Sequence, residues 1–425
     1  MTFSTYWSTN RLYRAHTDGD WCHIGATPGL HDAVPASAGY MTIRVALLTN
    51  IPAPYRLAFF KELGARCDLK VFFDSRSEPN RQWDVPADLG FAHAYLHGFA
   101  IARLRRRPDG IPNDRRYWQL RYEILPALFK FRPEVIVSSE FGPRSMQAAA
   151  YGAACGVPLV IWSEGTLHSE GWQGAIRRTV RRALVRRARG FWTNGVESSR
   201  LLESYGAARE NVQEGMIGVS TFRLAEAVRR LLPDRDAIRA ELGVMGTAFL
   251  FSGQLVPRKG VREFLAALTP LAAHRREFSA IFLGEGEQRA AIEQWARDHG
   301  EFRVLVLGFL QPEHVPRVYA AADVFVMPTL DDNWSLVALE AAVAGLPQIF
   351  SRYNGAAHDL LQRQAPGVVI DPFDIGSFTR ALRAFLGNGH RPASNDVTSS
   401  LIDYYGPQAC ADRALESLRA ASRGA

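Results

Sequence analysis

Short apolar runs alternate with segments of helical spacing along most of the chain. The runs are rich in Val, Ile, Leu and Phe and lack polar alternation, which is typical of parallel strands covered on both faces. They lie at 44–48, 69–73, 135–137, 159–162, 190–193, 249–253, 280–284, 303–308, 323–328, 347–351 and 367–371. This order predicts an α/β protein with two Rossmann-like, doubly wound domains that face each other across a cleft.

Breaks in this rhythm suggest where the domains begin and end. Residues 1–40 have no periodicity, and we expect a poorly ordered extension before a core that starts at Met41. The predicted order continues with a first domain, a linker containing a charged helix, a second domain, and a helix that crosses back to the first domain. These four parts occupy 41–220, 221–245, 246–400 and 401–425. A pair of domains like that of periplasmic binding proteins is the alternative, which the absence of a signal-peptide pattern disfavours.

Composition narrows the compartment and the class of partner. The 425 residues are 47% hydrophobic, enough for two domains with separate cores. The four cysteines are far apart without a CxxC pair, so neither a zinc site nor a disulfide framework is indicated. No apolar run reaches the length of a spanning helix. We therefore expect a cytoplasmic protein, soluble or peripheral at the inner face of the plasma membrane, whose net charge of +7 favours an acidic partner.

The stretch 323–347, DVFVMPTLDDNWSLVALEAAVAGLP, is the most informative part of the second series. It predicts a buried strand, a polar loop, and a helix that begins near Ser335 and ends at Gly345. In doubly wound domains the carboxyl end of a strand and the first N–H groups of the next helix line the ligand crevice, where an anion binds. Two acids, Asp332 and Glu340, flank this position.

Two further turns carry candidate ligand contacts in the same domain. FSGQLVPRKG places Arg258 and Lys259 in a loop after a strand, where an ammonium holds a phosphate as a point charge. FLGEGEQR places Gly284 in a Gly-x-Gly turn. Each motif alone is weak, since a basic pair before a helix is commonly solvated and Gly-x-Gly serves any tight turn.

Together, these motifs resemble those of a known enzyme family. The ordered set GQLVPRKG, LGEGEQR, LGFLQPEHVPRVYAAADVFVMPT and DDNWSLVALEAAVAGLP resembles the retaining nucleotide-sugar glycosyltransferases of family 4, which have the GT-B fold. The first domain matches more loosely, through TNIPAPYRLAFFKEL and the strand-loop pairs at Glu140 and Glu164. The resemblance implies a hexosyltransferase that moves a sugar from a nucleoside-diphosphate-sugar to a hydroxyl acceptor with retention, in polysaccharide, lipopolysaccharide or glycolipid biosynthesis.

The resemblance also implies roles for residues of the second domain. Asp332 and Glu340 match the family's paired acids, so Glu340 would hold the ribose hydroxyls and Asp332 would contact the donor sugar. Asp332 stands where most members have Glu, Ser335 where Gly is usual, and Gln254 where Arg is frequent. Backbone groups at the helix start would bind the diphosphate with help from the cations, and a preceding loop would bind the base. The donor-binding set is Gly253, Gln254, Arg258, Lys259, Gly284, Leu310, Ser335, Leu336, Val337 and Glu340.

In the first domain the resemblance points to the loop after PLVIW. The family commonly has a His there, whereas this chain has Glu164 at the aligned position and His168 four residues later. We assign Glu164 and His168, with Asp332, to the catalytic group; a surface position for His168 remains open. The acceptor side is assigned to Asn50, Tyr55, Arg56, Glu140 and Arg144.

No metal or cofactor is expected, because the nucleotide sugar is a co-substrate and a helix start with a cation neutralises its diphosphate. Asp234-Arg235-Asp236 imitates the DxD motif of metal-dependent transferases. It follows Pro233 at a helix start, where acids are ordinary first-turn residues.

An arginine-rich helix at 175–190, AIRRTVRRALVRRARG, carries Ile176, Val180 and Leu184 on one stripe. Such a helix suits an anionic membrane surface and a lipid-linked acceptor, and 102–110 adds a second basic cluster. Alternatively, the stripe packs on the sheet and the arginines are solvated. Nucleic acid is not an expected partner, because no aromatic interleaving accompanies the charge.

Two other functions share this fold prediction. A catalytically silent GT-B protein would bind a nucleotide without turnover. A GT-B nucleotide-sugar epimerase would form product without any acceptor.

Overall fold

The first of two parallel sheets lies in the N-terminal half of the chain. The computed structural model describes residues 42–77, 85–106, 112–272, 277–300, 302–387 and 393–423, with only the backbone at 100–106 and 112–118. Among these residues the first sheet has the strand order β3-β2-β1-β6-β7-β8-β9. The strands are β1 Arg44–Thr49, β2 Asp68–Phe73, β3 His93–Tyr95, β6 Val135–Ser139, β7 Leu159–Ser163, β8 Ala188–Thr193 and β9 Val212–Gln213. The helices are α1 Pro54–Gly64, α2 Ile124–Phe131, α3 Pro143–Cys155, α4 Leu167–Glu170, α5 Ala175–Arg187 and α6 Val196–Ser204, with a 3-10 turn η2 Arg209–Asn211.

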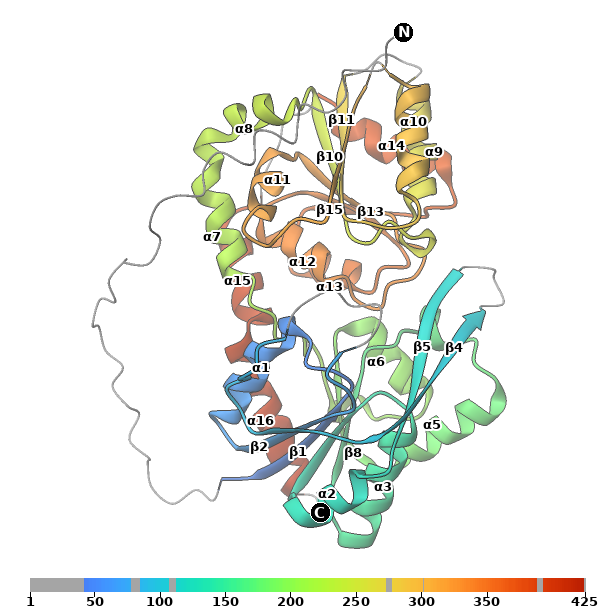
Figure 1. The fold of residues 1–425 in the computed structure, drawn as a ribbon, viewed down its shortest axis with the longest axis vertical. Helices are drawn as coiled ribbons and strands as arrows, with labels where there is room; N and C mark the ends of the chain where they lie inside the picture. The colour runs from blue at the N-terminus through green and yellow to red at the C-terminus, as the bar shows by residue number, and fades with distance from the viewer. Residues whose placement is uncertain are drawn as a thin grey trace, which may run out of the picture. The chain divides into compact units, whose positions relative to one another are not determined.

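The second sheet lies in the C-terminal half and has the order β12-β11-β10-β13-β14-β15 in the described chain (Figure 1). Its strands are β10 Thr247–Ser252, β11 Phe278–Leu283, β12 Arg303–Gly308, β13 Val324–Met327, β14 Gln348–Ser351 and β15 Gly367–Ile370. Its helices are α9 Val261–Ala272, α10 Arg289–Asp298, α11 Val315–Ala321, α12 Leu336–Val343, α13 Ala356–Gln362 and α14 Ile375–Phe385, with the 3-10 turn η4 Pro257–Lys259. Thr42–Ala425 is one unit, which contains both sheets.

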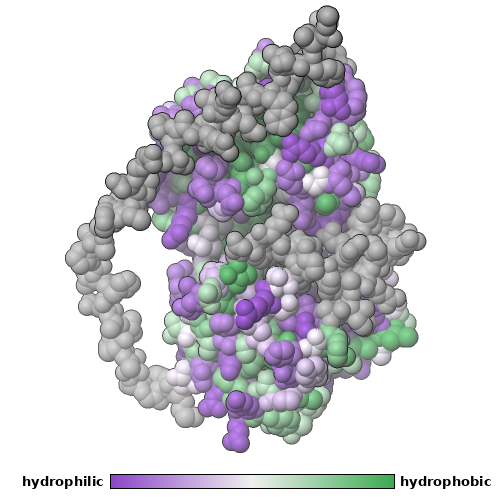
Figure 2. All heavy atoms as spheres, viewed as in Figure 1, coloured by the Kyte–Doolittle hydropathy of each residue, from purple (hydrophilic) through white to green (hydrophobic). Residues whose placement is uncertain are grey.

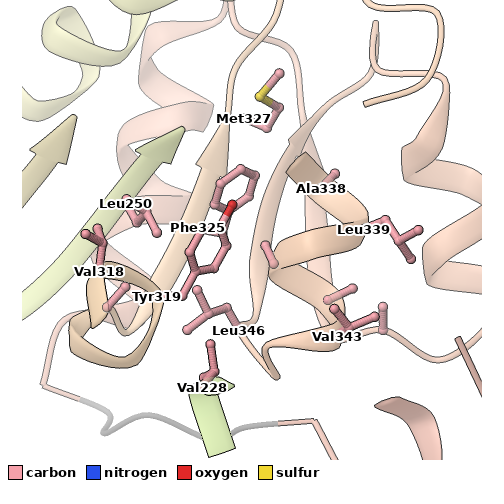
Figure 3. Close-up of a cluster of buried hydrophobic side chains, with 14 of the residues drawn as sticks. Val228, Leu250, Val318, Tyr319, Phe325, Met327, Ala338, Leu339, Val343 and Leu346 are labelled. Atoms are coloured by element: carbon pink, nitrogen blue, oxygen red, sulfur yellow. The ribbon is translucent and has the colours of Figure 1, made fainter. Parts of the chain in front are cut away.

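Both faces of each sheet are buried, which explains the unbroken apolar runs. In β10, Phe249 and Phe251 point into one core cluster while Ala248 and Leu250 point into another. Successive strand side chains alternate in direction, so a strand covered on both faces needs apolar residues at every position. Figure 3 shows the cluster that contains Leu250, where β13 packs against α12 and α11. The predicted α/β class with two doubly wound sheets is confirmed.

The segment between the two sheets contains more helix than predicted. Instead of one helix it has α7 Phe222–Leu231, the 3-10 turn η3 Leu232–Asp234 and α8 Arg235–Leu242. In the acidic motif at 234–236, Asp236 lies in the first turn of α8. Arg235 and Arg239 pair with Asp323 at 2.5 and 2.9 Å and so fasten α8 to the start of β13.

The C-terminal residues form two helices, α15 Asn395–Tyr405 and α16 Pro407–Arg423. Helix α16 packs against α1 and β8, as the red and blue helices of Figure 1 show. Arg66 Nε lies 2.7 Å from Asp412, and the Trp192 indole donates to Ser417 Oγ at 3.1 Å. The last helix is therefore part of the core of the first sheet.

A two-stranded antiparallel ribbon was not predicted. It consists of β4 Gly98–Arg106 and β5 Pro112–Arg121. Its strands contain three arginines each among their apolar residues, so no unbroken apolar run marked it. The predicted second basic cluster, 102–110, lies outside the described side chains, and the predicted extension 1–40 lies outside the described residues.

The arginine-rich helix is α5, and its stripe differs from the prediction. Leu184 is buried and Val180 packs beside it, but Ile176 is 83% exposed. Arg181 is buried instead: it pairs with Glu170 at 2.6 Å and donates to the Tyr205 hydroxyl at 2.9 Å. Arg181 therefore holds α5 to its own domain and does not belong to the solvated arginines.

Purple hydrophilic and green apolar residues are interspersed on the face drawn in Figure 2. None of the helices in the described ranges combines the length and apolar content that crossing a bilayer requires.

Candidate functional site

A basic loop after β10 meets the loop after β13. Lys259 Nζ lies 2.5 Å from Asp332 Oδ2, and these two side chains are only 12% and 13% exposed. The Arg258 carbonyl accepts from Leu330 N at 2.7 Å. Gly260, at a φ of 74°, permits this contact, because a Cβ there would lie 1.9 Å from the Pro328 carbonyl oxygen. The structure thus brings together the predicted cation and the first predicted acid.

The start of α12 offers donors to an anion. Ser335 is the N-cap residue of α12, and Leu336 and Val337 form its first turn. The side chain of Ser335 is 2% exposed, and its hydroxyl has no hydrogen-bond partner among the described residues. A buried hydroxyl without a partner is costly, so a ligand oxygen at this position would satisfy it together with the helix N–H groups.

Glu340 lies one turn further along α12 and is half-buried. The Tyr319 hydroxyl of α11 donates to Glu340 Oε2 at 3.2 Å. Burial raises the pKa of Glu340 to about 7, and burial beside Glu340 raises the pKa of Tyr319 well above its ordinary value. The tyrosine ring stacks on Phe325 in the core, which fixes the donor (Figure 3). The Glu340 carboxyl is therefore poised to change its protonation near neutral pH.

Two glycine turns lie at the carboxyl ends of β10 and β11. Gly253 N donates to the Leu283 carbonyl at 2.9 Å, and Gly284 lies so close that a Cβ on it would be 1.9 Å from the Gly253 carbonyl oxygen. Gln254 beside them is exposed. Leu310, in the loop after β12, packs its side chain against the core.

In the first domain, three of the predicted residues form one group. Arg56 and Glu164 make an ion pair, and the guanidinium of Arg56 lies 4.5 Å from the centroid of Trp162. Glu164 N donates to Glu140 Oε1 at 2.9 Å. The first turn of α1 and the loops after β6 and β7 therefore converge at the carboxyl edge of the first sheet.

The other acceptor-side residues lie beside this group but make different contacts. Arg144 pairs with Asp74 and donates to the Ser139 carbonyl at 2.7 Å. The Asn50 carbonyl accepts from Ser75 N at 2.9 Å. Tyr55 packs against the core cluster that contains α12, and the Arg56 guanidinium lies 5.5 Å from the centroid of its ring.

His168 reaches the second domain. Its Nε2 lies 2.8 Å from the Leu330 carbonyl oxygen, and its ring stacks on Tyr353 with centroids 4.4 Å apart and planes at 24°. The Tyr353 carbonyl also accepts from Asp332 N at 3.2 Å. His168 and Asp332 thus both contact Tyr353, which sequence reasoning missed although it lies two residues after the strand at 347–351.

A metal centre has no candidate in the described ranges, where no three side chains of His, Cys, Asp or Glu are grouped to hold an ion. The acids of the site are instead engaged with Lys259, Arg56 and Tyr319.

Comparison with known proteins finds a family model that resembles the second half of the chain. Residues 246–388 match the family model described as glycosyl transferases group 1. Curated relatives include a 2-deoxystreptamine glucosyltransferase of Streptomyces kanamyceticus, 28% identical over 49% of this chain and 54% of the relative. A glycogen synthase of Mycobacterium tuberculosis is 29% identical over 60% of this chain and 61% of the relative. The chain thus spans between about a third and three fifths of the first curated relatives that it matches.

Solved structures resemble nearly the whole chain. HepE of Anabaena in complex with UDP has a TM-score of 0.64 and 14% identity, covering 89% of this chain and 100% of that one. A sucrose-phosphate synthase from Thermosynechococcus elongatus has a TM-score of 0.63 and 16% identity, covering 88% and 98%. At this identity the likeness concerns the fold, and the predicted GT-B architecture is confirmed.

Proposed function

We propose that this chain, in which residues 246–388 match the model of the glycosyl transferases group 1 family, is a retaining glycosyltransferase. It transfers a hexose from a nucleoside-diphosphate-sugar to a hydroxyl acceptor in glycan or glycolipid synthesis. The observation that carries the proposal is the grouping of Lys259, Asp332 and Ser335 at the carboxyl edge of the second sheet, with Glu340 one helical turn away.

On the donor side, the Glu340 carboxylate accepts the two ribose hydroxyls, which suits an acceptor-only group. The diphosphate sits at the start of α12, where Ser335 Oγ and the first N–H groups donate to it. Lys259 supplies the positive charge and Arg258 lies beside it. Leu310 contributes its backbone to the base. A helix start and a cation stabilise charge that develops on the leaving diphosphate, so the proposal requires no metal ion.

The transfer itself breaks the bond between the anomeric carbon and the diphosphate oxygen. The acceptor oxygen forms the new bond on the same face of the sugar, and its proton passes to an oxygen of the departing phosphate. Asp332 and His168 hold the donor sugar from opposite domains, while Glu164 and Arg56 orient the acceptor hydroxyl. Positioning of both reactants and exclusion of water supply the rate enhancement.

The first experiment identifies the donor. Thermal shift against UDP-, GDP- and ADP-sugars should raise the melting temperature with one nucleotide class, because a ligand that binds only the folded state stabilises it. The active class is then assayed for transfer and hydrolysis with wild type, Asp332→Ala and Glu340→Ala. Both variants should lose at least about a hundredfold in kcat/KM, in line with removal of one transition-state contact. Unchanged turnover in both variants overturns the assignment of the site. Wild type that binds the nucleotide sugar without turnover is a catalytically silent protein, and wild type that converts the nucleotide sugar without any acceptor is an epimerase.

Membrane attachment is a second part of the proposal. Arg178, Arg182 and Arg186 are exposed and spaced four residues apart on α5, so they form one basic stripe. Such a stripe attracts anionic lipid headgroups at roughly 1 kcal/mol per basic residue. The proposal is that the enzyme attaches to the cytoplasmic face of a membrane, where it would meet a lipid-linked acceptor.

Vesicle flotation tests this attachment. Wild type should float with vesicles rich in phosphatidylglycerol but not with phosphatidylcholine alone, and the triple Ala variant at Arg178, Arg182 and Arg186 should stay in the soluble fraction. The matched control changes Arg223, Arg229 and Arg230, which are exposed on α7, by the same charge. Equal flotation of the two triple variants contradicts the assignment of the surface to α5.

A further inference from the structure

A buried carboxylate joins the two domains next to the loop between β13 and α12, residues 328–335, which we call the donor loop. Asp359, in α13, is 6% exposed. Its Oδ2 accepts from the indole Nε1 of Trp334 at 2.9 Å, and its Oδ1 accepts from Val196 N at 3.2 Å. Trp334 belongs to the donor loop and Val196 begins α6 of the first domain, so one side chain bonds both.

The first-domain side of this contact is shaped for a carboxylate. Helix α6 begins after Gly195, which provides no side chain to cap the helix. A carboxylate at a helix N-terminus satisfies a free N–H and is favoured by the helix dipole. The fit leaves no spare room, because a Cβ on Gly195 would lie 1.6 Å from Asp359 Oδ2.

The second-domain side holds the residue between the two predicted donor contacts. Trp334 lies in the same loop, after Asp332 and directly before Ser335, the N-cap residue of α12. Its ring is 6% exposed and packs on Tyr405 with centroids 5.1 Å apart. Fixing the indole therefore fixes the backbone from which the Ser335 hydroxyl and the first N–H groups of α12 project.

Helix α6 also contacts the acceptor side. Ser198 Oγ donates to the Glu164 carbonyl at 2.9 Å. A continuous set of contacts thus runs from the loop of Glu164 through α6 and Asp359 to Trp334 and the start of α12. Hydrogen bonds and packed side chains of this kind hold two sites in a fixed relation.

We propose that Asp359 is a positioning residue that sets the donor-phosphate loop against the first domain by bonding Trp334 and the α6 N-terminus at once. It touches no reacting atom. Its kinetic consequence rests on the proposed transferase activity, whereas the contact itself is measurable without substrate.

The contact is tested by the indole ¹H–¹⁵N resonance of Trp334, assigned by its absence in Trp334→Phe. Gly195→Ala, a change in the other domain, should shift this resonance, because the added methyl displaces the carboxylate that accepts from the indole. Asp359→Asn should shift it as well, while the other tryptophan resonances stay in place and report an intact fold. Asp374→Asn is the matched control, since Asp374 caps α14 of the same domain but is exposed. A Trp334 resonance unmoved by both Gly195→Ala and Asp359→Asn overturns the contact.

The positioning role is tested by kinetics. Trp334 Nε1 and Val196 N both donate to Asp359. The side-chain oxygen of Asn can accept from one of them, but its NH₂ group is a donor and cannot accept from the other. Asp359→Asn should lower kcat/KM for the donor by about tenfold or more, as misplaced groups do, and leave the acceptor KM unchanged. In Trp334→Phe the second donor is gone, so adding Asp359→Asn should cost less than the product of the single losses. Independent losses in the two variants, or equal changes in donor and acceptor KM, overturn the positioning role. If wild type transfers no sugar, the proposed function fails, but the Trp334 resonance still tests whether the contact exists.

Discussion

Lys259 and Asp332 form an ion pair, with Nζ and Oδ2 2.5 Å apart, that links the loop after β10 to the loop after β13. Both side chains are largely buried, so each charge depends on the other for compensation. In the absence of ligand, Asp332 therefore pairs with Lys259, the cation that is proposed to bind the diphosphate.

Removing one partner of this pair should destabilise the protein more than removing both. Lys259→Met leaves a largely buried carboxylate uncompensated, which costs roughly 3 kcal/mol, whereas Lys259→Met with Asp332→Leu leaves no charge. Urea unfolding measures the difference as a lower midpoint for the single variant. Equal midpoints for the single and double variants would show that the pair contributes nothing to folding.

Glu340 should make stability depend on pH. The folded protein binds this proton more tightly than the unfolded chain, because the pKa rises to about 7. Its contribution is thus complete below the unfolded pKa of about 4.3 and is lost as the pH rises through 7. Glu340→Gln, which stays neutral, should gain about 2 kcal/mol relative to wild type between pH 5 and 8. A constant difference in unfolding free energy over that range contradicts the raised pKa.

The same carboxyl should release a proton when a nucleotide binds. The ionised form accepts both ribose hydroxyls, so binding lowers the pKa and affinity should increase from pH 6 to about 7.5. Calorimetry with UDP, GDP or ADP in buffers of different ionisation enthalpy measures the protons released. The nucleotide phosphate titrates near pH 6 as well, and Glu340→Gln retains that part alone. Identical proton release by wild type and this variant argues against contact between Glu340 and the ligand.

Ser335 should affect folding and binding with opposite signs. Its buried hydroxyl has no partner among the described residues, so Ser335→Ala should leave stability unchanged or raise it. A hydrogen bond to a charged phosphate is worth about 1.5 to 3 kcal/mol, so nucleotide affinity should fall by about ten- to a hundredfold. Thermal unfolding and titration with the same nucleotide measure both. Affinity equal to that of wild type removes the hydroxyl from the phosphate site.

Alanine substitutions at two neighbouring glycines should show how much destabilisation comes from backbone strain alone and how much from steric conflict. Gly253 and Gly284 have φ values of 142° and 141°, but a Cβ meets open space on Gly253 and the Gly253 carbonyl oxygen on Gly284. Gly253→Ala should cost about 1 to 3 kcal/mol from strain, and Gly284→Ala should cost more because the turn must open. Chemical denaturation of both variants measures this, and equal costs would mean that the close approach is relieved without effect.

Much of the fold follows from local sequence. The apolar runs mark every strand of the second sheet and five strands of the first, because strands covered on both faces need apolar residues throughout. They missed β3 and β9, which are short strands at the two edges of the first sheet. The end of α12 before Gly345 follows from capping chemistry, because Gly345 has a φ of 81°. The start near Ser335 was also predicted, although the Ser335 side chain makes no capping hydrogen bond. Arg56, Glu140 and Glu164 also converge as expected, since carboxyl ends of parallel strands share one edge.

Other features depend on partners that are distant in sequence. The sequence around Arg181 does not predict its burial, because its partner Glu170 lies in another helix. The stacking of His168 on Tyr353 and the bonds of Asp359 join residues that only the tertiary fold brings together. The ribbon of β4 and β5 is held by backbone pairing between arginine-rich strands, so hydrophobic periodicity does not reveal it.

The position of α16 has a consequence for biosynthesis. Cys410, Ala414 and Leu418 of this helix belong to the same buried cluster as Val45 and Leu47 of the first strand. Domains usually fold in the order in which the ribosome releases them. Here the first domain to be translated lacks one wall of its core until residues 407–423 have emerged, whereas every strand of the second sheet is synthesised earlier. The core of the first sheet is therefore completed last, although its strands are translated first.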